Sequence, residues 1–251
     1  MSERYSVRPN QPGPPLGVRT VHKIKDNSTR IVLIRHGEAE CNVNGIIGGV
    51  RGCTGLTKKG IEQVNLLARR IELTGELKGT SAIYSSVLLR AVQTAKIISA
   101  SIARSCPDRE LLDSDDGLLE IIQSCELCEL HPGEADGLSW QEFSARYREP
   151  DWNVDPSTLL SPGGESWSGF IERAANAVTS IANSHRGEQV AIVCHAGVIE
   201  ATMSTFLPVQ SRSIRRGWIQ SEHASITEWE LSDGCWILRR FNDTTPKIDH
   251  Y

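Results

Sequence analysis

Two short apolar runs, far apart in the chain, each end in a histidine and a glycine. The first run, 30–34, is followed by Arg35-His36-Gly37, and the second, 189–194, is followed by His195-Ala-Gly197. Apolar residues without alternation are typical of central parallel strands that are buried on both faces. The pattern therefore predicts an α/β fold in which both strands deliver a histidine to the carboxyl edge of one sheet, where such folds bind ligands.

One histidine after a strand is more often a structural residue than a catalyst. Here two strand ends share the same design, which favours a functional site over coincidence. Gly37 removes a side chain where the backbone must turn, and we expect it to let a ligand approach closely.

Helical and strand periodicities surround these two runs. The clearest helix is predicted between Thr57, a favourable N-cap, and Gly75, which stops it. Further helices are expected over 88–104, 165–184 and 197–207, a capped helix after Ser139 and Glu142, a strand over 81–85, and a hairpin of 225–231 with 236–241.

The stretch 108–126 is acidic and has weak helical patterning at Leu118, Leu119, Ile121 and Ile122. We interpret it as a variable insertion beside the site. The glycine-rich stretch 38–55 is expected to be a loop over the strand edge.

Length and charge bound the class of protein. The 251 residues are 39% hydrophobic, enough for one domain, which we place at 30–242 between a flexible tail over 1–29 and a short tail over 243–251. The formal charge of −4 offers no general attraction to nucleic acid or to an anionic membrane. With no apolar stretch of membrane-spanning length and no signal-peptide core, we expect a cytoplasmic protein.

The seven cysteines are odd in number and scattered, which predicts reduced thiols rather than a disulfide framework. Cys125-x-x-Cys128 resembles half of a zinc site, but a structural site wants four ligands. Two incidental thiols are the favoured interpretation, and we predict no metal in the active site, which also lacks the clustered carboxylates of a magnesium site.

Several motifs occur in a characteristic order. They are Arg35-His36-Gly37-Glu38 with Asn42, Leu56-Thr57-x-x-Gly60, the segment 84–95 from Tyr-Ser-Ser to Gln-Thr-Ala, Pro162-Gly163-Gly164-Glu165-Ser166, and Cys194-His195-Ala196-Gly197. Together they resemble the histidine phosphatase superfamily, also called the phosphoglycerate mutase-like family, from about residue 30 to 242. The resemblance implies a three-layer α/β sandwich with a mostly parallel central sheet flanked by helices.

The same resemblance implies roles for individual residues. His36 would be the nucleophile that forms a phosphohistidine, and Glu129 the proton donor, with Glu126 and Glu134 as nearby alternatives. Arginine suits a phosphate site because its planar fork bonds two oxygens and keeps its charge. The residues implied to bind the phosphate are Arg35, Asn42, Arg90 and His195.

The chain departs from the family pattern near the site. The loop 49–57 lacks the aspartate and proline that the family often has there. His223 stands close to where the family often has an asparagine, and whether it replaces that residue is left open. A basic cluster of Arg212, Arg215 and Arg216 could be solvated or could lie at the rim of the pocket.

Three functions compete on this basis. The favoured one is a metal-independent phosphomonoester hydrolase that acts on a small phosphorylated metabolite without a cofactor. A cofactor-dependent phosphoglycerate mutase shares the first step, and a non-catalytic phosphate-binding regulatory module is disfavoured because His36 and Glu129 are both present. The expected partner is a small phosphate ester, and the oligomeric state, a homodimer included, is left open.

Overall fold

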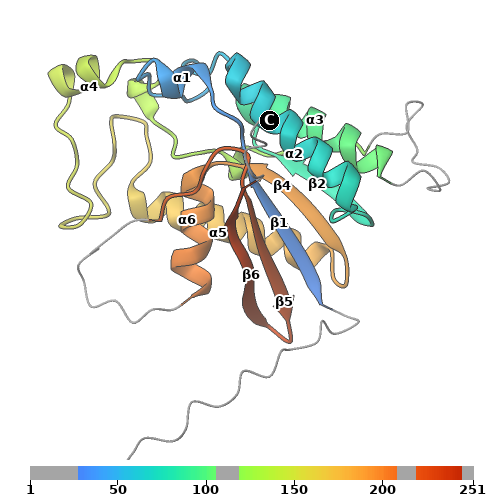
Figure 1. The fold of residues 1–251 in the computed structure, drawn as a ribbon. Coiled ribbons are helices and arrows are strands. Elements are labelled where there is room, and N and C mark those ends of the chain that lie inside the picture. The colour runs from blue at the N-terminus through green and yellow to red at the C-terminus, as the bar shows by residue number, and fades with distance from the viewer. Residues whose placement is uncertain (1–27, 106–118, 208–218, 245–251) are drawn as a thin grey trace, which may run out of the picture.

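The computed structural model describes residues 28–105, 119–207 and 219–244, and in them one six-stranded sheet lies between two layers of helices (Figure 1). The strand order is β3-β2-β4-β1-β5-β6. The strands are β1 (Thr29–Arg35), β2 (Thr80–Ser85), β3 (Ile121–Gln123), β4 (Gln189–Cys194), β5 (Ile226–Ser232) and β6 (Cys235–Asp243).

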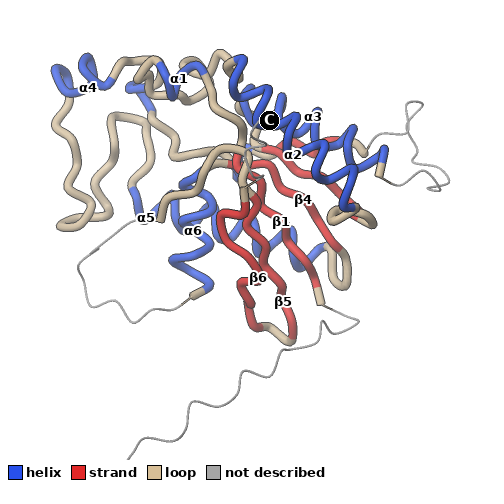
Figure 2. The backbone as a smooth tube through the Cα atoms, in the orientation of Figure 1, coloured by secondary structure: helices blue, strands red, loops and turns tan. Residues whose placement is uncertain are grey.

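The helices follow the expected order along the chain. They are α1 (Glu40–Val43), α2 (Lys58–Thr74), α3 (Leu89–Arg104), α4 (Trp140–Arg146), α5 (Trp167–Ser184) and α6 (Ala196–Phe206), with short 3-10 turns η1 (Cys125–Leu127) and η2 (Gly133–Ala135). Figure 2 shows that irregular backbone dominates between β3 and α5, beside α1. None of the helices within the described ranges has the length and apolar character needed to cross a bilayer.

The mostly parallel sheet is confirmed. β1 pairs with β4, β4 with β2, and β2 with β3, all in parallel, whereas β5 and β6 form an antiparallel hairpin on the other side of β1. Because β1 lies between β4 and β5, it is hydrogen-bonded on both edges, as its unbroken apolar sequence predicted.

Alternation along the central strands divides the core into two layers. Ile31 and Leu33 pack with α5 and α6, and Val32 and Ile34 pack with α2 and α3. Successive side chains of a strand point to opposite faces, so one apolar strand supplies both cores. The three-layer architecture follows from this double burial.

The predicted ends of α2 are confirmed by its caps. The Thr57 hydroxyl oxygen accepts a hydrogen bond from the Gly60 amide over 2.9 Å, and Gly75 ends the helix with a φ of 64°. The capping box of Ser139 and Glu142 is also present at the start of α4. The stretch 38–55 differs slightly from the expected loop, because it contains the one-turn helix α1.

The helix that the weak pattern around 118–122 predicted is wrong for the residues that the structure describes. Ile121–Gln123 is β3, which pairs in parallel with β2, and residues 106–118 of the expected insertion lie outside the described residues. The edge of β2 presents backbone groups that a short strand satisfies, and this pairing outweighs a weak local preference.

The expected domain limits lie close to the ends of the sheet. β1 begins at Thr29 and β6 ends at Asp243, one residue beyond each predicted boundary. Residues 1–27 and 245–251 of the expected tails, and the cluster of Arg212, Arg215 and Arg216, lie outside the described residues.

Candidate active site

The carboxyl ends of β1 and β4 bring the two predicted histidines together. Arg35 is the last residue of β1 and pairs in register with Cys194, the last residue of β4. The His36 amide then donates to the Cys194 carbonyl over 3.1 Å, and the ring centroids of His36 and His195 lie 5.1 Å apart. Parallel pairing of two strands thus joins residues that are 159 positions apart in the sequence.

The protonation state of His36 is defined by its two hydrogen-bond partners. Its Nδ1 lies 2.6 Å from the Gly37 carbonyl, which can only accept, so Nδ1 carries a proton. Nε of Arg90 donates to Nε2 of His36 over 3.1 Å, so Nε2 is the unprotonated nitrogen. Burial, and then the Arg90 charge, hold the pKa of His36 well below its ordinary value. His36 is therefore neutral, and its Nε2 carries a lone pair.

Arg90 is the second residue of α3 and is only 3% exposed, which excludes a solvated surface charge. Besides its bond to His36, one of its terminal nitrogens donates to the Gly48 carbonyl over 2.7 Å. Its backbone amide donates to Sγ of Cys53 over 3.4 Å. The glycine-rich stretch and the start of α3 thus hold the guanidinium against His36.

Arg35 directly precedes His36, and its guanidinium donates to the Ser221 carbonyl and, over 3.1 Å, to Nε2 of His223. Burial, and then the Arg35 charge, lower the pKa of His223 to about 4, so the imidazole is neutral and accepts this bond. His223 therefore orients Arg35. The sequence had left its role open, because the contact joins the end of β1 to the segment before β5.

His195 caps the start of α6 and is fully buried. Neither of its ring nitrogens is hydrogen-bonded to any residue within the described ranges, and the same holds for Nε of Arg35. Buried polar groups nearly always have a partner, so these atoms fit a site that binds an anion or another polar ligand. Burial, and then the Arg90 charge, hold the pKa of His195 well below its ordinary value.

Glu129 is the member of the three candidate acids that reaches this site. Its Oε2 accepts from the Gly197 amide over 3.1 Å, in the first turn of α6. A Cβ atom at Gly197 would lie 2.1 Å from Oε1 of Glu129, so this glycine makes room for the carboxyl group. Glu126 lines a different hollow, and Glu134 accepts from the Tyr147 hydroxyl over 3.0 Å.

A cavity of about 340 Å³ lies in front of these groups. The predicted site residues that line it are Arg35, His36, Asn42, Arg90 and Glu129, and the ring of His195 contacts that of His36. The Asn42 side chain also accepts from the Ala39 amide over 3.2 Å, so part of its amide is used in capping α1.

The outer wall of the cavity is apolar and was not predicted. Trp152 and Trp167 stack with their rings 5.5 Å apart, and Trp140, from α4, is 51% exposed. The other apolar lining residues are Ile46, Ile47, Leu130, Pro132 and Leu160. Sequence reasoning missed this wall because α4 and the segment before α5 converge only in the folded chain.

Two buried thiols next to Arg90 were also missed. Sγ of Cys41 lies 3.8 Å from a terminal nitrogen of Arg90, and the hydrogen bond between Cys41 and Cys53, aided by the Arg90 charge, lowers the pKa of Cys53. Their spacing in the sequence carried no signal, because cysteine pairs of this separation are ordinary.

The expected role of Gly37 needs correction. A Cβ atom there would lie 2.5 Å from the Gly60 carbonyl oxygen and 2.8 Å from the side chain of Val64. The glycine therefore lets α2 pack against the turn after β1, rather than letting a ligand approach.

The family model of the histidine phosphatase superfamily (branch 1) matches residues 31–244. This range contains all six strands except Thr29 and Arg30, the first two residues of β1. This chain belongs to that superfamily. The assignment explains why the predicted motifs meet at one sheet edge, and it agrees with the fold class and family that the sequence predicted.

Individual relatives support the assignment. The metal-independent phosphoserine phosphatase of Arabidopsis thaliana is 30% identical over 228 residues, with 89% of this chain and 85% of that protein aligned. Phosphoglycerate mutase-like protein 4 of the same plant is 29% identical, with 86% and 85% covered. Among solved structures, YhfR of Bacillus stearothermophilus superposes with a TM-score of 0.67 at 28% identity, covering 86% of this chain and 98% of that one.

Metal-binding geometry occurs elsewhere in the molecule. Within the described part of the chain, the group of histidine, cysteine and acidic side chains close enough to share an ion is Cys125, Cys128 and His131. None of these three lines the cavity.

Proposed function

We propose that this protein is a metal-independent phosphomonoester hydrolase that cleaves a small phosphorylated metabolite through a phosphohistidine on His36. The observation that carries the proposal is the neutral tautomer of His36, whose unprotonated Nε2 accepts a hydrogen bond from Arg90. A nucleophile must offer a lone pair, and a transferring phosphoryl group needs cations around its oxygens.

In the first step Nε2 of His36 attacks phosphorus, and the bond from phosphorus to the ester oxygen breaks. Arg90 exchanges its bond to Nε2 for a phosphate oxygen, and Arg35 and His195 stabilise the other oxygens. Glu129, which lines the cavity, gives the leaving oxygen its proton.

The second step returns the enzyme to its starting state. Water attacks the phosphohistidine in line, Glu129 takes a proton from that water, and His36 leaves as the neutral imidazole. The Nδ1 bond to the Gly37 carbonyl persists throughout, so the ring keeps its orientation. All charge stabilisation in both steps comes from organic groups.

The three tryptophans in the cavity favour a substrate whose organic part packs on aromatic rings. Trp140, Trp152 and Trp167 line the same cavity as Arg35, His36 and Arg90. Indole faces accept apolar surface and also ammonium groups. Phosphoserine, the substrate in the printed name of the Arabidopsis relative, is therefore a suitable first probe.

The mutase alternative requires further cations to hold a second phosphate. Among the residues that the structure describes, two cationic side chains line the cavity, Arg35 and Arg90. Arg51, which could have added a third, is held away by Asp136, with Nε 3.8 Å from its carboxylate. Two cations in the cavity suffice for one phosphate group, so this number favours the hydrolase over a mutase that must hold and reorient a bisphosphate. The silent-module alternative is disfavoured by the nucleophilic tautomer of His36.

Two assays test the proposal. Release of inorganic phosphate from nitrophenyl phosphate, phosphoserine and 3-phosphoglycerate should be observed in the presence of a chelator. With 3-phosphoglycerate and catalytic 2,3-bisphosphoglycerate, rapid formation of 2-phosphoglycerate and much slower phosphate release would instead establish the mutase. Absence of turnover on every ester would favour the binding module.

A further inference from the structure

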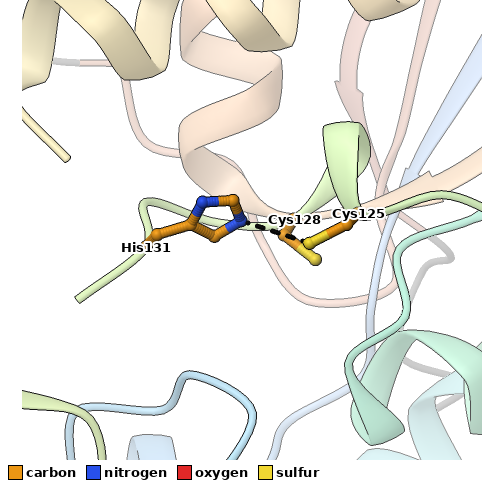
Figure 3. Close-up of side chains that lie close together, drawn as sticks. All are labelled: Cys125, Cys128 and His131. Carbon is orange, nitrogen blue, oxygen red and sulfur yellow. Dashed lines mark hydrogen bonds between the residues drawn. The ribbon is translucent and has the colours of Figure 1, made fainter. Parts of the chain in front are cut away.

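Three potential metal ligands converge on the loop that carries Glu129. Figure 3 shows the Cys125 and Cys128 thiols and the His131 ring facing one another, and their ligand atoms all lie within 4.8 Å of each other. Nε2 of His131 is 3.4 Å from Sγ of Cys125. Sulfur and imidazole nitrogen at such separations match two corners of a tetrahedral zinc site, with metal-ligand distances of about 2.0–2.3 Å.

The outer surroundings of this cluster have the features of a metal site. Nδ1 of His131 lies 3.5 Å from Oε2 of Glu165, so a carboxylate faces the nitrogen that would not bind the ion. Such a carboxylate orients a metal-binding imidazole and makes it more basic. Glu165 is itself held by Arg173 through two hydrogen bonds of 2.7 Å.

The loop backbone is also held in place before any ion binds. Arg173 donates to the carbonyl of Glu126 over 2.8 Å and to that of Cys128 over 3.2 Å. Because the ligands sit on an already ordered loop, little conformational entropy remains to be lost when a metal binds.

The Cys128 sulfur also has a polar partner outside the cluster. The Ser86 hydroxyl, just after the end of β2, donates to its Sγ over 3.3 Å. This contact holds the sulfur next to the other two side chains.

We propose that Cys125, Cys128 and His131 bind a zinc ion that holds the loop around Glu129 in one conformation and takes no part in phosphoryl transfer. Two cysteines and one histidine supply three protein ligands, one fewer than structural zinc sites usually have, and water completes the tetrahedron on the exposed side of Cys125. Sequence analysis recognised only the two cysteines, although His131 follows Cys128 by three residues.

The site is separate from catalysis but linked to it by the chain. Glu129 lies between the two ligands Cys128 and His131, and its side chain points to the Gly197 amide. Zinc would therefore restrict the loop while leaving the carboxyl group in its cavity. Removal of zinc should lower Tm and leave nitrophenyl phosphate hydrolysis within about twofold.

Cobalt and zinc titrations of the reduced, chelator-treated full chain test this proposal. One equivalent of Co²⁺ should produce a thiolate-to-cobalt charge-transfer band, and Zn²⁺ should abolish it. Zinc at 100 times its Kd should raise Tm by roughly 5 °C or more. Cys125→Ser and His131→Gln should lose both effects, whereas Cys235→Ser, at an exposed cysteine of β6, should retain them.

Cys125 is exposed, so its replacement is expected to fold, and Tm without metal checks this for each variant. Cys128→Ser serves only as a supporting variant because that residue is buried. No charge-transfer band in the wild type, or a band that survives Cys125→Ser and His131→Gln, would overturn the proposal. A metal requirement for turnover would overturn its separation from catalysis.

Discussion

Nε of Arg90 donates a hydrogen bond to Nε2 of His36 over 3.1 Å, and both side chains are only 3% exposed. The proposed nucleophilic nitrogen is thus held by the same guanidinium that is proposed to bind the phosphate. This contact keeps the imidazole in one tautomer until a substrate oxygen replaces His36 as the acceptor.

Arg90→Lys should lower kcat/KM by about 10²–10³-fold, the cost of losing a charge-stabilising donor in a transition state. Lysine keeps the charge but carries all its donors on one atom, so it loses the planar fork in which Nε donates to His36 and a terminal nitrogen donates to Gly48. Arg104→Lys, on the exposed end of the same helix and paired with Glu72, is the matched control. Steady-state kinetics measure kcat/KM of both variants. Equal activity of the two would show that Arg90 does not bind the substrate phosphate.

His36→Ala should abolish turnover, with a loss of at least about 10⁴-fold, because removal of a nucleophile prevents the covalent step. Rapid quench of the wild type with labelled substrate should trap phosphate that is labile to acid and stable to base. The control is His185→Gln, which should keep the activity. His185 lies at the C-terminal end of α5, next to the Tyr84 hydroxyl. Label on serine, aspartate or cysteine would contradict the assignment.

Glu129→Gln should slow alkyl phosphates by about 10²–10⁴-fold, the usual contribution of general acid catalysis. Nitrophenyl phosphate should be affected far less, because its phenolate leaves with little need of a proton. Glu126→Gln and Glu134→Gln are matched controls from the same loop region and should behave as the wild type. An equal loss on both kinds of ester would move the acid role to another residue.

Stability should fall at acid pH because of three histidines at the site. Burial lowers the pKa of His36, His195 and His223, the last to about 4. Below pH 6.5 the unfolded chain therefore binds more protons than the folded one, and the free energy of unfolding decreases as pH falls from 6.5 towards 4. Each histidine contributes up to about 1.4 kcal/mol per pH unit in this window.

Urea denaturation at pH values from 7 to 4.5 measures this dependence. His223→Asn should make the slope shallower, since one of the three titrating groups is removed. A free energy of unfolding that stays constant or increases towards acid pH would show that these histidines are protonated in the folded protein.

Local patterns predicted the elements that depend on short-range physics. The N-cap Thr57 and the left-handed Gly75 define α2 through bonds within a few residues of each end, so both could be seen in the sequence. The weak pattern at Ile121 failed, because pairing with β2 decides the conformation of that segment. Gly37 was recognised as special, but its reason, contact with Gly60 of α2, depends on helix packing.

The sequence by itself determined which side chains meet at the sheet edge, because buried strands must end where the backbone turns, and Arg35, His36 and His195 stand at those turns. The order of the family motifs added Arg90 and Glu129 to the predicted site. Only the tertiary structure decided that His223 orients Arg35, that three tryptophans line the cavity, and that His131 joins Cys125 and Cys128. Such contacts arise where loops fold over the sheet, and their geometry depends on packing that no local periodicity records.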